Sequence, residues 1–358
     1  MSGGEESIND SNSELEISNG NRRQLEVGED AEPKPKRPRC ENNQKNENND
    51  FPAATSYGMK KWHLKTAIVT GASSGIGAAI SKKLVSAGMN VVGIARRESA
   101  LQKIKRNMED EGLTNGDAKF IPLTGDLTDH EVIDKHLEWI DNNLNGIHVL
   151  VNNAGIMQIS KLMDTEEEYW NRVFQTNVLA VARMTKQVLK IMKKNHFDYG
   201  HIINISSVAG NNNSYPIPGM VPYFISKKAV ATISEGFRAE LSDAQSLVKI
   251  TTISPGLVRT GIIENSGLSK IIPDDAPALD RSDVAEAVHF VLSTPRNVVI
   301  SELTIQAITE SIHIRLMNPK KPHSALPSSV PMEEDENGGN GTTEDKNGGN
   351  GNNDDNAD

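Results

Sequence analysis

Short apolar runs alternate with longer amphipathic stretches through the middle of the chain. The apolar runs have the length and composition of strands that are buried on both faces of a parallel sheet. The stretches between them repeat apolar residues with helical spacing, which is typical of helices covering such a sheet. The runs cover residues 67–69, 90–95, 119–123, 148–151, 201–207, 249–253 and 298–305. The alternation predicts an α/β fold, a doubly wound domain with a seven-stranded parallel sheet.

The turn after the first run is rich in glycine. Gly71 lets the backbone leave the strand sharply, while Gly75 and Gly77 remove side chains where the main chain approaches a phosphate or another strand. A helix that starts here directs free N–H groups and its positive dipole end at the turn, which creates an anion site. In a doubly wound sheet, the pyrophosphate of a dinucleotide binds at this place. Taken alone, the motif also fits a glycine-rich turn without a ligand.

The second run ends in Ala95 and is followed by Arg96 and Arg97. The adenosine ribose of a dinucleotide lies at the tip of this strand, where a carboxylate would bind the free hydroxyls of NAD. Ala95 has no carboxylate, and Arg96 supplies a cation for a 2′-phosphate. The pattern therefore favours NADP(H) over NAD(H), with Ser73 and Ser74 as further hydrogen-bonding groups. The alternative is a pair of arginines that face solvent at a helix start.

Polar groups also follow the third and fourth runs. Asp126 fits a hydrogen bond from an adenine amino group, with Leu127 against the ring, and it fits a turn or cap aspartate equally well. The Asn152-Asn153 pair ends the fourth run and is expected to tie neighbouring strands by side-chain hydrogen bonds. The small residues of Ala154-Gly155 leave space for a flat ring.

Tyr223 and Lys227 are four residues apart and share one face of a predicted helix. That face is directed at the end of the fifth run, which carries Ser207, so the three side chains form an arrangement suited to proton transfer. A Tyr-x-x-x-Lys pair by itself is common and carries little information. Asn177 lies in the middle of a long helix predicted for residues 166–194, which is a poor position for asparagine unless it faces solvent or has a function.

The two ends of the chain differ in composition from its middle. Residues 1–58 and 318–358 are rich in polar and acidic residues with few large apolar ones, which predicts disordered tails. They carry net charges of −5 and −6 out of −10 for the chain, so residues 59–317 are close to neutral at +1. The middle has the length of one large domain, and its neutrality argues against a nucleic-acid surface spread over it.

Cys40 is the only cysteine, so neither an internal disulfide nor a cysteine metal cluster can form, and no metal is expected. No run reaches transmembrane length, and the acidic start of the chain lacks an apolar secretory region. The cytoplasm is the expected location. Two basic clusters, Arg22-Arg23 and Lys34–Arg39, resemble a bipartite nuclear import signal, and a chance basic island fits them equally well.

In their order, the motifs resemble those of the short-chain dehydrogenase/reductase family, over residues 62–310. The matching residues are Thr70-Gly71-x-x-x-Gly75-x-Gly77, Asp126, Asn152-Asn153-Ala154-Gly155, Asn177, Ser207, Tyr223-x-x-x-Lys227 and Pro255-Gly256. No element is decisive alone, whereas six of them in this order are highly specific. Within the family, Arg96-Arg97 and residues 200–204 and 301–305 resemble the insect farnesol dehydrogenases and the member 11 dehydrogenase/reductases. The resemblance implies a single Rossmann-type domain.

The resemblance also implies roles for four side chains. Tyr223 would be the general acid/base, and Lys227 would lower its pKa from the usual value near ~10 and hold the nicotinamide ribose. Ser207 would bind the substrate oxygen, and Asn177 would hold a water that links Lys227 to solvent. The residues expected against the cofactor are Gly71, Ser73, Ser74, Gly75, Ile76, Gly77, Arg96, Arg97, Asp126, Leu127, Asn153, Ala154, Gly155, Tyr223, Lys227, Pro255, Gly256, Val258 and Thr260.

The spacing between the serine and the tyrosine departs from the family. Ser207 lies 16 residues before Tyr223, which is three more than in most of the family, and the extra length falls in the Asn211-Asn212-Asn213 loop. Ser206 is the rival serine. The Val-x-Gly turn that follows Ser207 favours Ser207.

The activity implied by the resemblance is NADP(H)-dependent interconversion of an alcohol and a carbonyl compound, in a homodimer or homotetramer. Residues 256–280 are rich in Leu and Ile, so the expected substrate is apolar: a farnesol-like terpenoid, a steroid or a small carbonyl compound. Two alternatives stay open. One is an NADP(H)-binding regulator without turnover, and the other is a nuclear interaction protein that acts through its tails.

Overall fold

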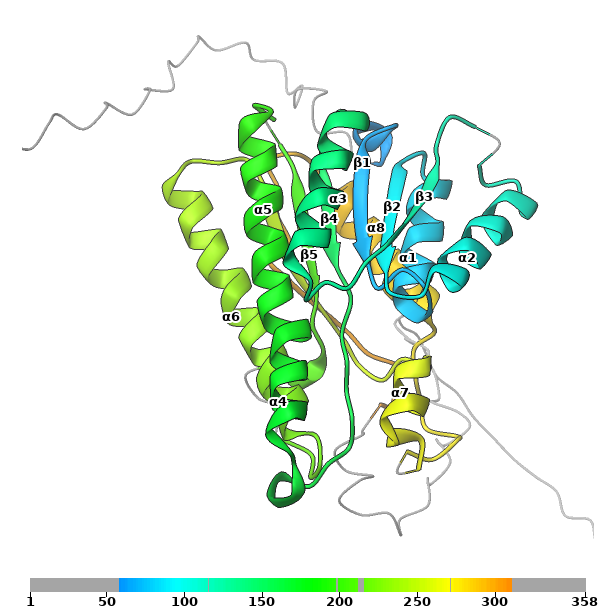
Figure 1. Cartoon of the computed structure of the whole chain (residues 1–358), viewed down its shortest axis with the longest axis vertical. Coiled ribbons are helices and arrows are strands. Elements are labelled where there is room, and N and C mark those ends of the chain that lie inside the picture. Colours follow the sequence, from blue (N-terminus) through cyan, green and yellow to red (C-terminus); the bar gives the residue numbers. More distant parts are fainter. Residues whose placement is uncertain (1–57, 115, 198, 212–215, 271, 311–358) are drawn as a thin grey trace, which may run out of the picture. The chain divides into compact units, whose positions relative to one another are not determined.

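Seven parallel strands form one sheet in the order β3-β2-β1-β4-β5-β6-β7 (Figure 1). They are β1 (Thr66–Thr70), β2 (Asn90–Ala95), β3 (Phe120–Thr124), β4 (Val149–Asn152), β5 (His201–Ile205), β6 (Lys249–Pro255) and β7 (Glu302–Ile305). The structure is a computed structural model and describes residues 58–310 except 115, 198, 212–215 and 271. The strand order reverses between β1 and β4, which is the switch point where doubly wound sheets bind ligands. The predicted Rossmann-type fold is confirmed.

Helices cover both faces of the sheet (Figure 1). They are α1 (Gly75–Ser86), α2 (Glu98–Asp110), α3 (His130–Asn143), α4 (Glu167–Phe174), α5 (Ala180–Lys194), α6 (Val221–Asp243), α7 (Gly261–Ser266) and α8 (Arg281–Ser293). Helices α1, α2 and α8 contribute to the hydrophobic core on one face. Helices α3, α5 and α6 contribute to the core on the other face.

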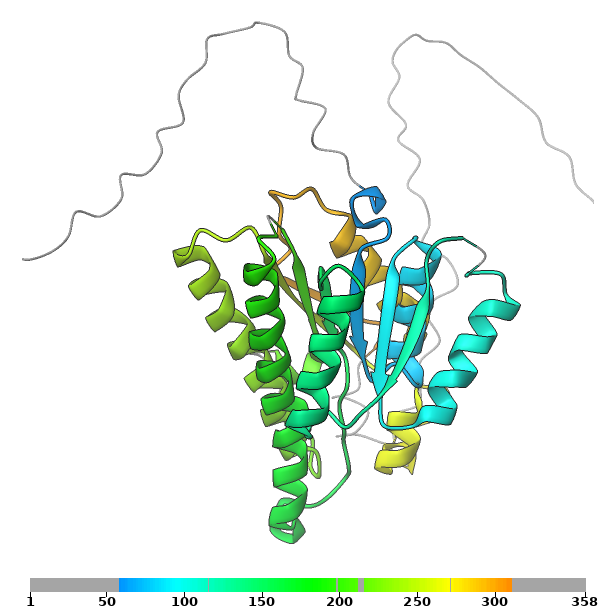
Figure 2. The same ribbon diagram turned by 45° about the horizontal axis from the view of Figure 1, so that its top comes forward.

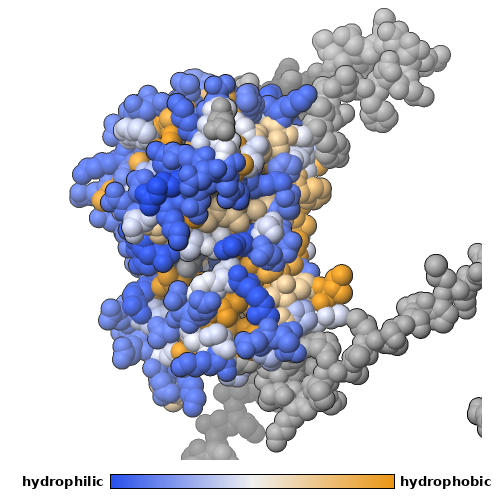
Figure 3. All heavy atoms as spheres, turned by 90° about the vertical axis from the view of Figure 1, so that its right-hand side faces the viewer, coloured by the Kyte–Doolittle hydropathy of each residue, from blue (hydrophilic) through white to orange (hydrophobic). Residues whose placement is uncertain are grey.

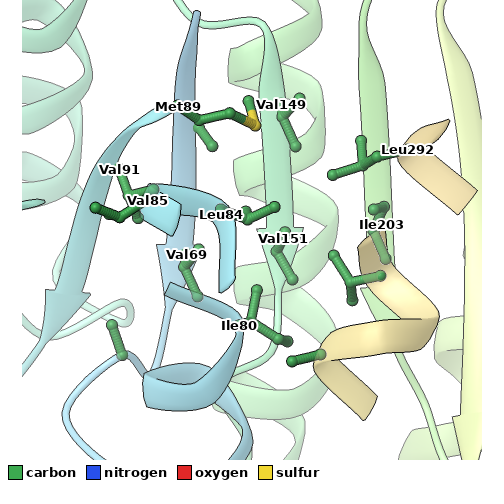
Figure 4. Close-up of a cluster of buried hydrophobic side chains, with 14 of the residues drawn as sticks. Val69, Ile80, Leu84, Val85, Met89, Val91, Val149, Val151, Ile203 and Leu292 are labelled. Carbon is green, nitrogen blue, oxygen red and sulfur yellow. The ribbon is translucent and has the colours of Figure 1, made fainter. Parts of the chain in front are cut away.

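Alternation along β1 explains why the first apolar run is continuous. Ala67 and Val69 point into the core beside α1 and α8, whereas Ile68 points into the core beside α3 and α5. All three are fully buried. Figure 4 shows Val69, together with strand residues from β4 and β5, directed toward Ile80 of α1. Because both faces are covered, the strand carries no polar position between its ends.

The helix predicted over residues 166–194 contains an irregularity. Helix α4 passes into a π-helical turn at Gln175–Leu179, and the chain then continues as α5. Figure 2 shows the green α4 and α5 ribbons following one another as a single rod. A π turn widens the backbone locally and is frequently found at functional sites. Asn177 lies inside this turn.

The seventh strand is shorter than the predicted run over residues 298–305. It starts at Glu302, and two earlier carbonyl groups accept hydrogen bonds from side chains of β6. The Val298 carbonyl accepts from Lys249 Nζ at 2.8 Å, and the Ile300 carbonyl accepts from Thr251 Oγ1 at 2.7 Å.

Several predictions concern residues outside the described part of the chain. These are the two tails, the basic clusters at 22–39, Cys40, and Asn212-Asn213 of the long loop. Among the described residues, the helices are all too short or too polar to cross a bilayer.

Candidate active site

The glycine turn joins β1 to the first turn of α1. Gly71 and Gly75 have φ angles of +68° and +56°, in the region that favours glycine. A Cβ atom on Gly77 would collide with the Gly71 carbonyl and the Asn153 side chain. Ser74 precedes α1 without making a side-chain cap, so the first N–H groups of the helix remain available to a ligand. The close main-chain approach predicted for this turn is present.

The two arginines after β2 lie differently. Arg97 Nη2 donates to Ser73 Oγ at 3.2 Å and to Ser74 Oγ at 2.9 Å. Arg96 Nη1 lies 3.9 Å from Asp126 Oδ2, and the Arg96 side chain is 71% exposed. The sequence interpretation gave the leading role to Arg96. The structure places Arg97 against the glycine turn and Arg96 beside Asp126, and a phosphate contact of Arg96 stays a prediction.

Asp126 has a turn role. Its Oδ1 atom accepts from the Thr128 N–H at 2.9 Å and from Thr128 Oγ1 at 2.8 Å. Its Oδ2 atom faces Arg96. Leu127 packs against the core beside α3. The turn interpretation of Asp126 is therefore confirmed, and an adenine contact stays a prediction for Oδ2.

The paired asparagines at the end of β4 tie three strands together, as predicted. Asn152 Nδ2 donates to Asn204 Oδ1 of β5 at 2.8 Å. On the other side, Asn153 Nδ2 donates to the carbonyl of Thr70 in β1 at 2.8 Å. The main-chain N–H groups of Asn153 and Ala154 both donate to Thr70 Oγ1, at 2.9 and 3.1 Å. These bonds fix the carboxyl edge of the sheet at the switch point.

Tyr223 and Lys227 lie on one face of α6, as expected from their spacing. Lys227 is buried, and its Nζ atom donates to the Ile205 carbonyl at 2.9 Å. Burial lowers the pKa of Lys227 to about 8. Burial raises the pKa of Tyr223 to about 12, and a hydrogen bond with Ser207 only partly offsets this. Desolvation of the phenolate therefore sets the direction of the shift in this structure, and the lowering of the tyrosine pKa by Lys227 that the resemblance implies stays a prediction.

The two candidate serines at the end of β5 have different partners. Ser207 hydrogen-bonds with Tyr223 and accepts from the Ala209 N–H at 3.2 Å. Ser206 is buried and donates to the main-chain carbonyl of Lys227 at 3.1 Å. Ser206 thus attaches the strand to α6, while Ser207 is the serine beside the tyrosine.

Asn177 is buried, so the solvent-facing alternative is wrong. Its Oδ1 atom accepts from the Ile156 N–H at 2.8 Å, and its Nδ2 atom donates to the Ile156 carbonyl at 2.9 Å and to Ser226 Oγ at 3.1 Å. Ser226 Oγ in turn donates to the carbonyl of Tyr223 at 2.7 Å. A Cβ atom on Gly155 would lie 3.5 Å from Asn177 Oδ1 and 3.7 Å from Lys227 Nζ. Gly155 therefore leaves room beside both polar groups.

The Pro255-Gly256 turn carries a contact that sequence reasoning missed. Glu310 Oε1 accepts from the Leu257 N–H at 2.7 Å, and Glu310 Oε2 accepts from the Ala307 N–H at 3.1 Å. A Cβ atom on Gly256 would collide with this carboxylate. Burial raises the pKa of Glu310, and the two main-chain hydrogen bonds oppose the rise. Nothing in the local sequence links Glu310 to a turn more than fifty residues earlier.

The end of the turn after β6 faces the glycine turn. The Cγ2 atom of Thr260 lies 3.3 Å from the place that a Cβ atom of Gly75 would occupy. Val258 pairs with Leu279 in an isolated parallel bridge. The chain that follows β6 therefore reaches across to the first residue of α1.

An apolar cluster adjoins Tyr223. Its buried members come from the turn after β5, from the start of α6 and the residue before it, from the turn after β6 and from the chain around α7, and partly buried residues pack against it. They are Ala209, Met220, Phe224, Leu257, Leu268, Ile272 and Ala276, with Met157, Ile159, Ile217, Tyr223, Ile263 and Ala278 against them. Figure 3 looks onto the side of the domain where α2 and α7 lie: hydrophobic side chains gather in its lower part, at the level of α7.

No trio of His, Cys, Asp or Glu side chains among the described residues is arranged to hold a metal ion.

The family model of the short chain dehydrogenases matches residues 65–270, which include the glycine turn and the Tyr223–Lys227 pair. The chain belongs to this family.

Short-chain dehydrogenases of known sequence are similar over nearly their whole length. Farnesol dehydrogenase of Aedes aegypti is 39% identical over 70% of this chain and 99% of the relative. Dehydrogenase/reductase SDR family member 11 of Homo sapiens is 36% identical over 70% of this chain and 96% of the relative. Both groups were expected from the sequence, and the recognition is confirmed.

Solved structures of short-chain dehydrogenases share the fold. The closed form of a serine dehydrogenase complexed with NADP+ matches with a TM-score of 0.61 and 30% identity, over 69% of this chain and 96% of that one. An alcohol dehydrogenase from the archaeon Thermococcus sibiricus, complexed with 5-hydroxy-NADP, matches with a TM-score of 0.60 and 26% identity, over 69% and 98%.

Proposed function

We propose that this short-chain dehydrogenase is an NADP(H)-dependent enzyme that interconverts an apolar alcohol and its aldehyde or ketone. One observation carries the proposal: the Tyr223 hydroxyl is hydrogen-bonded to Ser207, while Lys227 and Asn177 lie beside Gly155 at the same edge of the sheet. The group combines a proton donor, a hydrogen-bonding partner for a substrate oxygen and a cation. These are the components that carbonyl reduction requires from a protein.

The glycine turn fits a dinucleotide. The uncapped start of α1 offers N–H groups to a pyrophosphate, and Gly77 lets the start of α1 lie directly against the Gly71 carbonyl, where any side chain would collide. NADP(H), when bound, supplies or accepts the hydride. Lys227 would hold the nicotinamide ribose. The residues after β6, Val258 and Thr260, and those after β4, Asn153 to Gly155, would line the nicotinamide end.

The proton chemistry belongs to the side chains. In the reducing direction, the carbonyl carbon gains the hydride while Tyr223 donates its hydroxyl proton to the carbonyl oxygen. This hydroxyl is protonated at neutral pH, and Lys227 would bring its raised pKa down toward the working pH, as efficient proton transfer requires. Ser207 would hold the substrate oxygen in place. Asn177 hydrogen-bonds to Ile156 and to Ser226, which in turn hydrogen-bonds to the Tyr223 carbonyl. It would therefore hold these residues in position and support a water that resupplies protons.

NADP(H) is the proposed cofactor in preference to NAD(H). Arg97 joins Ser73 and Ser74 at the tip of β2, with Arg96 next to it, and Ala95 contributes no carboxylate that would repel a 2′-phosphate. The solved relatives complexed with NADP+ and 5-hydroxy-NADP agree with this choice. Asp126 Oδ2 and Leu127 would contact the adenine.

The apolar cluster beside Tyr223 supports an apolar substrate, and the similarity to a farnesol dehydrogenase points to a terpenoid alcohol as one member of the class. A homodimer or homotetramer is proposed as well, since Leu179 and Ile225 on the outer surface near α5 and α6 are 50% and 41% exposed. The proposed location is the cytoplasm, with nuclear entry through the basic clusters at 22–39.

The test is a turnover assay of the purified full chain with terpenoid, steroid and small carbonyl substrates, each with NADPH and with NADH. The proposal expects turnover of apolar members with NADPH. Binding of NADPH without turnover of any substrate would instead favour a regulator that senses the cofactor. Removal of residues 1–58 and 318–358 should leave the reductase activity unchanged, whereas a protein acting through its tails would lose its function.

A further inference from the structure

Tyr169 of α4 holds the main chain of a neighbouring segment in the same way as Asn177. Its hydroxyl accepts from the Gln158 N–H at 2.8 Å and donates to the Gln158 carbonyl at 3.0 Å. Asn177 makes the equivalent pair of bonds with Ile156, at 2.8 and 2.9 Å. Two buried side chains from one helical rod therefore hold alternate residues of the segment 156–160.

The same segment is bonded on its other side to the chain that surrounds the apolar cluster. The Ile159 N–H donates to the Ser266 carbonyl at the end of α7, at 2.9 Å. The Ser160 N–H donates to the carbonyl of Gly219, just before α6, at 3.0 Å. The segment 156–160 thus connects the α4 rod with both α7 and the start of α6.

Side chains of this segment take part in the apolar cluster. Met157 and Ile159 pack against it, as Tyr223 does. The Cγ2 atom of Ile159 also lies 3.0 Å from the place that a Cβ atom of Gly219 would occupy, so Ile159 fits closely against the chain before α6. The two residues alternate with Ile156 and Gln158, whose main-chain groups the rod holds. Fixing Ile156 and Gln158 therefore also fixes where Met157 and Ile159 lie in the cluster that Tyr223 adjoins.

We propose that Tyr169 is a positioning residue that holds Met157 and Ile159 as a wall of the substrate site, and that this wall selects long apolar substrates. The inference rests on the proposed function. Tyr169 is 5% exposed and both of its polar bonds go to one residue, so its hydroxyl serves the segment alone. A long apolar substrate can bury more of its surface against this wall than a short one can, and therefore gains more binding free energy from it.

The variant Tyr169→Phe tests the proposal, because it keeps the ring and removes only the hydroxyl. It leaves the N–H and carbonyl of Gln158 without partners, which loosens the wall. With n-aldehydes from butanal to dodecanal, we expect kcat/KM for dodecanal to fall roughly tenfold, mainly through KM, and that for butanal to change little. The Kd for NADPH should stay unchanged, and amide hydrogen exchange of residues 156–160 should become faster.

Two matched variants separate positioning from general stability. Tyr199→Phe removes another tyrosine hydroxyl that donates to a main-chain carbonyl, that of Lys61. Tyr199 precedes β5, whereas Ser207 follows it, so Tyr199 lies toward the opposite edge of the sheet and the variant should leave the aldehyde preference unchanged. Gln158→Ala removes an exposed side chain but keeps the main-chain groups. Its aldehyde preference and its amide exchange in residues 156–160 should equal those of the wild type.

An equal loss for both aldehydes, or faster exchange without a change of preference, would overturn the proposal. Unchanged exchange of residues 156–160 in Tyr169→Phe would overturn it as well. A wild-type protein that turns over no aldehyde, ketone or alcohol of the substrate panel ends the proposed function and, with it, the inference about selectivity. That outcome is visible before any variant is made, and the exchange measurement still decides whether Tyr169 holds the segment.

Discussion

The Nζ atom of Lys227 lies 5.7 Å from the centre of the Tyr223 ring, one helical turn along α6. Its hydrogen bond goes to the Ile205 carbonyl, and the tyrosine hydroxyl is bonded to Ser207. The two groups are therefore neighbours on one face without a direct polar bond. Burial disfavours the charged form of each group. It therefore raises the pKa of Tyr223, whose charged form is the phenolate, and lowers the pKa of Lys227, whose charged form is the ammonium.

The first prediction concerns Tyr223 as the proton donor. Tyr223→Phe keeps the ring within the apolar cluster, so folding and NADPH affinity should be preserved. Turnover should fall by roughly 10²-fold or more, because the hydroxyl that would donate the proton is gone. The measurement is kcat beside a Kd for NADPH. Near-normal turnover in a folded variant would remove Tyr223 from the mechanism and leave Ser207 as the candidate.

The second prediction distinguishes the two arginines. Arg97→Ala should weaken NADPH by roughly 10- to 100-fold, the effect of one charge-assisted contact to phosphate, and leave NADH almost unchanged. Arg96→Ala should have a smaller effect, since Arg96 is largely exposed and has Asp126 as a neighbour. The measurement is kcat/KM for both cofactors. A wild-type preference for NADH would contradict the proposal that the two arginines bind the 2′-phosphate.

The third prediction concerns Glu310 and the turn after β6. Glu310→Ala leaves the Leu257 N–H without its partner, so the free energy of unfolding should fall by about 1–3 kcal/mol. Glu310→Gln keeps an acceptor oxygen at this place and should cost much less. Urea unfolding of the two variants makes the comparison. Equal losses would mean that the charge of Glu310, and not its hydrogen bond, matters.

The fourth prediction concerns acid stability. His201 is fully buried at the start of β5, and burial lowers its pKa from 6.5 to about 3. Between these values the unfolded chain binds the proton and the folded protein does not, so this contribution is complete above pH 6.5 and is lost as the pH falls. From pH 7 to pH 5 the loss should be about 2 kcal/mol.

Urea unfolding at the two pH values measures this difference. His201→Gln, which can still reach Thr251 Oγ1, should show a smaller difference between the two pH values than the wild type. His130→Gln, at an exposed position at the start of α3, is the control and should keep the full difference. An unchanged pH dependence in His201→Gln would assign the acid sensitivity to other groups.

The fifth prediction concerns the basic clusters of the N-terminal tail. A reporter fused to residues 1–58 should enter the nucleus if Arg22-Arg23 and Lys34–Arg39 act together as an import signal. Replacing Lys36 and Arg37 by Ala should return the reporter to the cytosol. Fluorescence microscopy measures the ratio of nuclear to cytosolic reporter signal. A reporter that is evenly distributed in both forms would leave the clusters without a targeting role.

The sequence by itself determined the fold and the location of the site along the chain. Strands buried on both faces must be apolar throughout, so Ala67–Val69 and its counterparts were visible as runs. The glycine turn was visible because only glycine tolerates the backbone of Gly71 and the close approach at Gly77. The Tyr223–Lys227 spacing was readable because residues four apart share a helix face.

Only the tertiary structure decided which partners these residues have. It brought Arg97 rather than Arg96 to the glycine turn, chose Ser207 over Ser206 beside Tyr223, and raised the tyrosine pKa. It also joined Glu310 to the turn after β6 and Tyr169 to Gln158. Periodicity fixes the face on which a side chain lies, whereas desolvation and hydrogen bonds depend on which distant segments fold against that face.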